Sequence, residues 1–216
     1  MQISDYQAII FDLDGVLANS EPAIFRIHQD VLRQTYQRVM APEDYHDLFG
    51  LDYHDSASFL IRKYAIQTTP QELAEDLHRT VVQEIAQVIE PISGAQKFVK
   101  CISQYHIPTG LASNSPSDYV IRVVAALGLS AYFPAPVCRD DVKNGKPAPD
   151  PYLEACRRVQ ADPFRCLAVE DSPVGLQAAI AAGMQCALVG PVDPKSQSPN
   201  IHRFANIGAL QSALLD

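Results

Sequence analysis

The segment Ala8-Ile9-Ile10-Phe11-Asp12-Leu13-Asp14-Gly15-Val16 decides the fold of this chain. Its apolar start is typical of a buried parallel strand, and two carboxylates one residue apart follow it. In extended chain, side chains at i and i+2 point to the same side, so Asp12 and Asp14 could face one site. Parallel sheets bind ligands at the carboxyl ends of their strands, where these acids stand. Because two like charges there repel unless a cation or a raised pKa relieves them, the segment indicates a metal-assisted nucleophile beside a general acid.

The rest of the chain divides into a helical stretch and an alternating stretch. Apolar residues recur at helical spacing within residues 24–32, 56–64 and 69–88, and a capping box, Thr69-Pro70-Gln71-Glu72, opens the third segment. From residue 91 onward the pattern predicts helices over 95–104, 116–127, 152–159, 174–182 and 210–215, strands over 108–112, 135–138, 166–169 and 186–189, an edge strand near Phe204 and a polar surface loop over 193–200.

The alternating stretch and the first strand are expected to share one sheet, which makes the helical stretch an insertion. We therefore predict an α/β fold with a Rossmann-like, doubly wound parallel sheet as its core, formed by residues 1–16 and 89–216. Residues 17–88 are predicted to form an all-helical cap domain. An insert that leaves the sheet just after the carboxylates is expected to act as a lid, which excludes water and selects substrates.

Composition narrows the class of protein. The 216 residues are 47% hydrophobic and 19% charged, as in an ordinary globular protein. A net charge of −8 argues against a partner that is nucleic acid or an anionic membrane. Five scattered cysteines without C-x-x-C spacing indicate free thiols in a reducing compartment. With neither a signal peptide nor an apolar run of about 20 residues, a cytoplasmic location is expected.

Four polar motifs fall at the ends of predicted strands or just beyond them. They are Asp12 with Asp14, Ser113-Asn114-Ser115, Lys146, and Glu170-Asp171-Ser172. Taken singly, each has a structural interpretation: a polar turn, a helix N-cap, a solvated lysine, and a second helix cap. Parallel connectivity brings the carboxyl ends of the strands together, so the four motifs are expected to converge on one crevice.

In this order, the motifs resemble those of the haloacid dehalogenase superfamily, and the match covers essentially the whole chain. The runs Gly145-Lys146-Pro147-Ala148-Pro149-Asp150-Pro151 and Glu170-Asp171-Ser172-Pro173-Val174-Gly175 are similar to its phosphatase and β-phosphoglucomutase branch, in which the helical insert is the cap. The resemblance implies that Asp12 is a nucleophile that forms an aspartyl-phosphate. It also implies that Asp14 protonates the leaving oxygen and then deprotonates the hydrolytic water.

The resemblance further implies a Mg²⁺ cofactor. Its ligands would be Asp12, the backbone carbonyl of Asp14, and Asp171, with Glu170 as a further ligand or as support for the others. Ser113 and the backbone N–H of Asn114 would bind phosphoryl oxygens. Lys146 would stabilise the charge on those oxygens in the transition state. The implied partner is a small-molecule phosphate monoester, bound by a monomer or a weak homodimer.

Three other activities can be compared with a phosphatase. Dehalogenases of the superfamily lack the second acid, which this chain keeps as Asp14. β-Phosphoglucomutases carry a cap histidine and two cap cations, whereas Ile24, Phe49 and Tyr53 stand at the matching places here. Hydrolysis of a sugar phosphate, phosphoglycolate or a similar metabolite is therefore favoured, and a phosphosugar mutase is the alternative. A non-catalytic phosphate-binding module is less favoured, because Asp12, Asp14 and Lys146 are all retained.

The cap residues expected to face the substrate are Phe49, Tyr53 and His54. Core packing within the cap is an equally good interpretation of the two aromatic residues. The other histidines lack the spacing of metal ligands and are expected at the surface or at helix caps: His28, His46, His78, His106 and His202.

Overall fold

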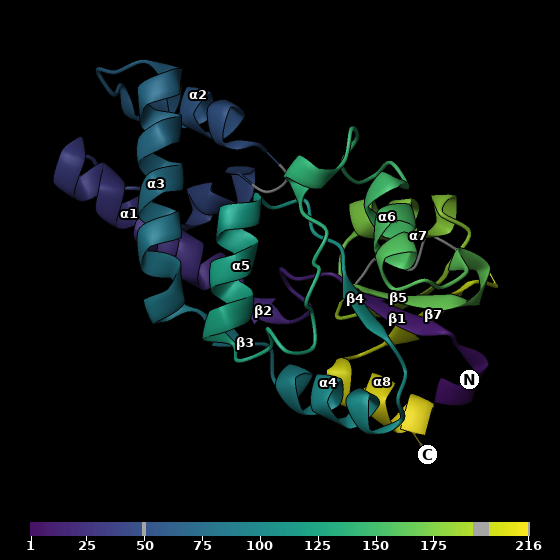
Figure 1. Cartoon of the computed structure of the whole chain (residues 1–216). Helices are drawn as coiled ribbons and strands as arrows, with labels where there is room; N and C mark the ends of the chain where they lie inside the picture. The colour runs from purple at the N-terminus through teal and green to yellow at the C-terminus, as the bar shows by residue number, and fades with distance from the viewer. Residues whose placement is uncertain (49–50, 192–198, 216) are drawn as a thin grey trace. The chain divides into compact units, whose positions relative to one another are not determined.

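The computed structural model describes residues 1–48, 51–191 and 199–215 of the chain (Figure 1). The chain divides into two compact units. One comprises Met1–Asn19 with Glu90–Asp216, and the other comprises Ser20–Ile89. The predicted domain boundaries, after residues 16 and 88, lie within three residues of this division. Most of the predicted surface loop over 193–200 lies outside the described residues.

The first unit is built on a parallel sheet, as the alternating pattern predicted. Its strand order is β4-β1-β5-β6-β7, and every neighbouring pair is parallel. The strands are β1 (Ala8–Phe11), β4 (Thr109–Leu111), β5 (Cys166–Glu170), β6 (Gln185–Val189) and β7 (Ile201–Phe204). The last of these is the edge strand that was predicted near Phe204. A short antiparallel pair, β2 (Ala18–Asn19) with β3 (Glu90–Pro91), was not predicted.

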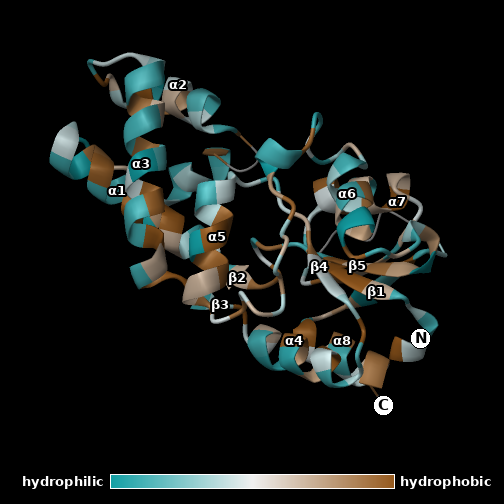
Figure 2. Cartoon of the chain, viewed as in Figure 1, coloured by the Kyte–Doolittle hydropathy of each residue, from teal (hydrophilic) through white to brown (hydrophobic). Residues whose placement is uncertain are grey.

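Helices cover both faces of this sheet (Figure 1). Helices α4 (Ala95–Gln104) and α8 (Ile207–Leu215) lie on one face, and α6 (Asp150–Arg158) and α7 (Pro173–Ala181) lie on the other. Strand β1 is apolar along its length (Figure 2), and it needs to be, because both of its faces are covered. Ile10 belongs to the core under α6 and α7. Phe11 packs edge-on against Phe98 of α4, with ring centroids 5.9 Å apart.

One predicted strand is wrong. Residues 135–138 form no strand; within the described structure their contact with the sheet is a single bridge between Val137 and Ala112. Pro134 and Pro136 explain the difference, because proline has no N–H to donate to a strand ladder. The bridge still matters for the site, since the N–H of Ser113 donates to the carbonyl of Val137 at 2.9 Å.

The second unit is helical. It contains α1 (Ser20–Thr35), a 3-10 helix (Pro42–Leu48), α2 (Tyr53–Tyr64) and α3 (Pro70–Val88). The predicted capping box is confirmed: the hydroxyl of Thr69 accepts from the N–H of Glu72, and the Glu72 carboxylate accepts from the N–H of Thr69. The core of the second unit is aliphatic and includes Leu32, Leu60 and Leu73.

Among the described residues of the whole chain, the helices are all too short or too polar to cross a membrane.

His28 is neither at the surface nor at a helix cap, contrary to expectation. It lies in the middle of α1, is 5% exposed, and has no hydrogen-bond partner for either ring nitrogen among the described residues. Its neighbours include the rings of Tyr45 and Tyr53, at centroid distances of 6.3 and 6.2 Å. Burial lowers the pKa of His28 from 6.5 to about 4, because the imidazolium form loses its hydration.

This burial predicts that the protein is less stable in mild acid. Between pH 6.5 and pH 4 the unfolded chain binds a proton that folded His28 excludes, so the free energy of unfolding falls as the pH falls. At pH 5 the loss from this one group is about 2 kcal/mol. Urea unfolding at pH 7 and pH 5 measures it. The variant His28→Leu, which does not titrate, is expected to lose less stability than the wild type; equal losses would contradict the prediction.

Candidate active site

The register of the sheet determines where the motifs meet. Phe11 of β1 pairs with Leu111 of β4 on one side and with Val169 of β5 on the other. The N–H of Asp12 continues the ladder by donating to the carbonyl of Val169 at 3.0 Å. Asp12 therefore stands beside Glu170 and beside the start of the loop that carries Ser113.

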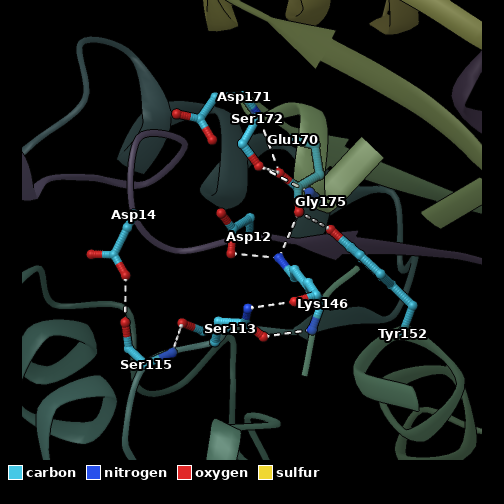
Figure 3. Close-up of polar contacts among 11 residues, drawn as sticks. Asp12, Asp14, Ser113, Ser115, Lys146, Tyr152, Glu170, Asp171, Ser172 and Gly175 are labelled. Carbon is cyan, nitrogen blue, oxygen red and sulfur yellow. Dashed lines mark hydrogen bonds and ion pairs between the residues drawn. The ribbon is translucent and has the colours of Figure 1, made fainter. Parts of the chain in front are cut away.

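A buried ammonium joins the ends of β1 and β5 (Figure 3). The Nζ atom of Lys146 lies 2.7 Å from Oδ1 of Asp12 and 2.5 Å from Oε1 of Glu170. Only 4% of the Lys146 side chain is exposed, so its charge must be paired inside the protein. Burial acts to lower the pKa of Lys146, but the two carboxylates outweigh it and raise the pKa above its usual value. Lys146 is therefore a fixed cation.

Glu170 is fully buried and all of its acceptor sites are in use. Oε1 accepts from Lys146 and from the hydroxyl of Tyr152, at 2.5 and 2.6 Å. Oε2 accepts from the N–H of Asp171 and the hydroxyl of Ser172, both at 3.2 Å. A carboxylate has about four lone-pair sites, and these four donors fill them. Glu170 is thus better placed to hold Lys146 than to bind a metal ion.

Tyr152 is a site residue that the sequence analysis missed. It is fully buried in helix α6, and the Lys146 ammonium lies 4.9 Å from the centre of its ring. Burial, followed by the charge of Glu170, raises the pKa of Tyr152 well above its usual value, so its hydroxyl stays a donor. A signal was available, because a tyrosine on the inward face of a helix needs a buried partner for its hydroxyl.

Three carboxylates form an acidic group at the end of β1 and β5. Oxygens of Asp12, Glu170 and Asp171 lie within 4.8 Å of one another. Burial and the charge of Glu170 raise the pKa of Asp12 well above its usual value, against the effect of Lys146. Burial, followed by Glu170, also raises the pKa of Asp171 to about 7. Ionising Asp171 beside the other carboxylates is therefore unfavourable without a further cation.

A hard divalent cation such as Mg²⁺ fits this group, because its preferred ligands are oxygens. Because four donors occupy the carboxylate oxygens of Glu170, Asp12 and Asp171 are the carboxylates of this group that have lone pairs left to bind a metal ion. Gly15 leaves room beside them: it has a φ of +80°, and a Cβ there would lie 1.8 Å from Oδ2 of Asp171. A side chain at position 15 would thus displace the Asp171 carboxylate.

The carboxylate of Asp14 does not join this acidic group. Its Oδ2 accepts from the hydroxyl of Ser115 at 2.8 Å, and its Oδ1 accepts from the hydroxyl of Tyr119 at 2.7 Å (Figure 3 shows the first contact). The reason is local backbone geometry. Strand β1 ends at Phe11 and the chain turns at Gly15, so the rule that i and i+2 share a side does not extend to Asp14.

The loop after β4 carries the second motif. Ser113 is buried, and its hydroxyl accepts from the N–H of Ser115 at 3.0 Å. Asn114 directs its side chain to the backbone of Lys146, where it makes two hydrogen bonds. Helix α5 (Ser117–Ala126) begins after this loop, so the two residues precede the helix and do not cap it.

The residues expected to face substrate from the cap all belong to the helical unit. Phe49 lies outside the described residues. Tyr53 begins α2 and its ring packs against His78, with centroids 5.0 Å apart, as well as against His28. His54 is exposed. Within this unit, Tyr53 thus contributes to packing and His54 remains accessible.

Comparisons with known proteins point to one family. A family model described as haloacid dehalogenase-like hydrolase matches residues 9–189. Fructose-1-phosphate phosphatase YqaB of Escherichia coli strain K12 is 30% identical over 184 residues, which are 83% of this chain and 94% of that protein. A phosphorylated carbohydrates phosphatase of Thermotoga maritima is 26% identical over 179 residues, 83% of this chain and 82% of that protein. The structure of CbbY from Rhodobacter sphaeroides in complex with phosphate shares the fold, with a TM-score of 0.79, 24% identity, and coverage of 95% of this chain and 96% of that one.

Proposed function

Because the chain belongs to the haloacid dehalogenase-like hydrolase family, we propose that it is a Mg²⁺-dependent phosphatase acting on a small phosphate monoester. The observation that carries this proposal is the buried Lys146 ammonium, which lies between the Asp12 and Glu170 carboxylates. The names of two relatives, a fructose-1-phosphate phosphatase and a phosphorylated carbohydrates phosphatase, favour a phosphorylated sugar as the substrate.

The proposed reaction proceeds through an aspartyl-phosphate. An oxygen of Asp12 attacks phosphorus, the bond from phosphorus to the ester oxygen breaks, and Asp14 protonates the leaving oxygen. Asp14 then removes a proton from a water molecule that attacks the aspartyl-phosphate, which regenerates Asp12 and releases inorganic phosphate. For both steps the Asp14 carboxylate has to leave the hydroxyls of Ser115 and Tyr119 and turn toward the bound phosphate.

The remaining site residues bind and stabilise the transferring group. Lys146 is a preorganised cation beside the attacking oxygen, and Glu170 holds it there. Ser113 and the backbone N–H of Asn114 would bind phosphoryl oxygens. The Mg²⁺ ligands would be Asp12, Asp171 and the backbone carbonyl of Asp14, and the bound ion would polarise a phosphoryl oxygen and offset repulsion by the carboxylates.

The proposal extends to the helical unit and to the cell. We assign residues 20–89 the function of a cap that selects the substrate, and exposed His54 is the residue of this unit that we expect to contact it. All five cysteines are free thiols, which supports a cytoplasmic location. The partner is a small molecule, with neither nucleic acid nor membrane involved, and the protein acts as a monomer or a weak homodimer.

Turnover of p-nitrophenyl phosphate tests the reaction class. Phosphate release with Mg²⁺ that stops when EDTA is added supports a metal-dependent phosphatase. Absence of turnover at any concentration of divalent ion would instead support a phosphate-binding module.

The mutase alternative has its own assay. A mutase incubated with β-glucose 1-phosphate and a trace of the bisphosphate would give glucose 6-phosphate without free phosphate. A panel of phosphorylated metabolites then identifies the substrate.

The variant Asp14→Asn tests the acid–base role. Asparagine keeps the size of the side chain and the backbone carbonyl, but it transfers no proton, so kcat is expected to fall by about 10²- to 10⁴-fold. Mg²⁺ affinity, measured by calorimetric titration, is expected to stay within about threefold of the wild type, because the Asp14 side chain is not in the acidic group. A wild-type rate in this variant would refute the role.

A further inference from the structure

Asn114 holds the backbone of Lys146 at both of its polar groups. The Oδ1 atom of Asn114 accepts from the N–H of Lys146 at 2.7 Å, and its Nδ2 atom donates to the carbonyl of the same residue at 3.0 Å. One amide side chain thus satisfies one peptide donor and one peptide acceptor, as a neighbouring strand would. The two residues are 32 positions apart in the sequence, so this contact joins the loop after β4 to the loop before α6.

The residue before Lys146 is Gly145, and its lack of a side chain leaves room for this contact. A Cβ at position 145 would lie 2.7 Å from Oδ1 of Asn114, closer than such atoms approach one another in proteins. Gly145 therefore leaves the space in which the Asn114 amide reaches the Lys146 backbone. Asn144, in the same loop, bonds instead to the start of α6, from its Nδ2 atom to Asp150 at 3.1 Å.

Holding the backbone of Lys146 determines where its ammonium can lie. A lysine side chain has four rotatable bonds and loses rotamer entropy when it is fixed. The two carboxylates fix its far end, and the Asn114 amide fixes its near end. A shift of about 1 Å in a charged group that acts on the transition state can reduce the rate by about 100-fold.

We infer that the Asn114 side chain is a positioning residue, which acts through Lys146 by holding its backbone and thereby its ammonium. This inference rests on the proposed phosphatase function and deepens it. It differs from the binding of phosphate by the backbone N–H of Asn114, because a change of side chain leaves that N–H in place.

The first test removes only the side chain. For Asn114→Ala, kcat with p-nitrophenyl phosphate is expected to fall by about 10- to 100-fold, with a much smaller change in KM. In a Lys146→Met background the same substitution is expected to change kcat by less than about threefold, because the residue through which it acts is gone. Asn144→Ala, an amide deletion in the same loop, is the matched control and is expected to keep the wild-type rate.

A second pair of variants does not depend on Lys146→Met folding. Gly145→Ala is expected to lower kcat as Asn114→Ala does, because its methyl group displaces the Asn114 amide. In an Asn114→Ala background Gly145→Ala is expected to have little further effect, since the Asn114 oxygen that it strikes has been removed. The next neighbour of the added Cβ, Cδ of Arg139 at 3.0 Å, belongs to an exposed, flexible side chain that can move aside. Independent losses that multiply in the double variant would overturn the inference.

Amide hydrogen exchange tests the contact between the Asn114 side chain and the Lys146 backbone without depending on enzyme activity. The N–H of Lys146 is expected to exchange at least about tenfold faster in Asn114→Ala than in the wild type, and unchanged exchange would overturn the inference. If the wild type is active and the Asn114→Ala variant is fully active, the inference about Asn114 is overturned and the proposed function is not affected. A wild type that hydrolyses no phosphate monoester would overturn the proposed function, and with it the catalytic part of this inference.

Discussion

Replacing Asp12 by asparagine is expected to abolish phosphate release, with kcat reduced by about 10⁴-fold or more. The variant lacks the carboxylate that we propose as the nucleophile, which is also one of the two carboxylates to which the Lys146 ammonium is bound. Steady-state assays with p-nitrophenyl phosphate and Mg²⁺ measure the loss, and mass spectrometry tests whether a covalent phosphate forms on the wild-type chain and is absent from the variant.

The loss should not come from unfolding. Asp12 is largely buried in an acidic group that raises its pKa, so removing its charge relieves repulsion, while the asparagine oxygen can still accept from Lys146. We expect the urea midpoint of the variant to equal or exceed that of the wild type. Asp30→Asn, which changes a surface ion pair with Arg33, is the control and should keep the wild-type rate. Residual turnover in Asp12→Asn above about 1% would contradict a nucleophilic role.

Most of the fold could be predicted because its strongest signals are local. Apolar runs such as residues 8–11 and 166–169 correspond to buried strands, and the helix over 95–104 was predicted with the bounds it has. The family resemblance, based on the four motifs, is confirmed by the match of the family model over residues 9–189. The strand predicted over 135–138 failed because Pro136 within it and Pro134 just before it lack the N–H donors that a sheet requires.

The sequence indicated the residues of the candidate site apart from Tyr152, but it did not indicate their contacts. Order along the chain indicates that Asp12, Lys146 and Glu170 meet, because the carboxyl ends of parallel strands meet. It does not indicate which carboxylate oxygen each donor occupies, and that detail separates Glu170, whose sites are all taken, from Asp171. The direction of the Asp14 side chain depends on a turn at Gly15 that strand periodicity does not describe.

Gly175→Ala is expected to reduce kcat by about 100-fold or more, although residue 175 touches neither the substrate nor the metal ion in the proposed mechanism. A Cβ at this position would lie 1.8 Å from Oε1 and 2.1 Å from Oε2 of Glu170. The Glu170 carboxylate would have to move, and its contacts with Lys146 and Tyr152 would break with it. Breaking a buried ion pair and crowding a packed core together predict a loss of about 2–5 kcal/mol in the free energy of unfolding.

Two comparisons separate this cause from a general effect of alanine in a helix. Gly208→Ala lies in α8, where the nearest atom to its Cβ is 3.2 Å away at Oδ1 of Asn206, and it is expected to change stability by less than about 1 kcal/mol. In a Glu170→Ala background, Gly175→Ala should have little effect on stability, because the carboxylate that it strikes is absent. Urea unfolding of Gly175→Ala, Gly208→Ala, Glu170→Ala and the double variant Glu170→Ala/Gly175→Ala measures both changes in stability. A loss at Gly175 that persists without Glu170 would place its cause in the packing of α7 and would remove the link between this glycine and the Lys146 ammonium.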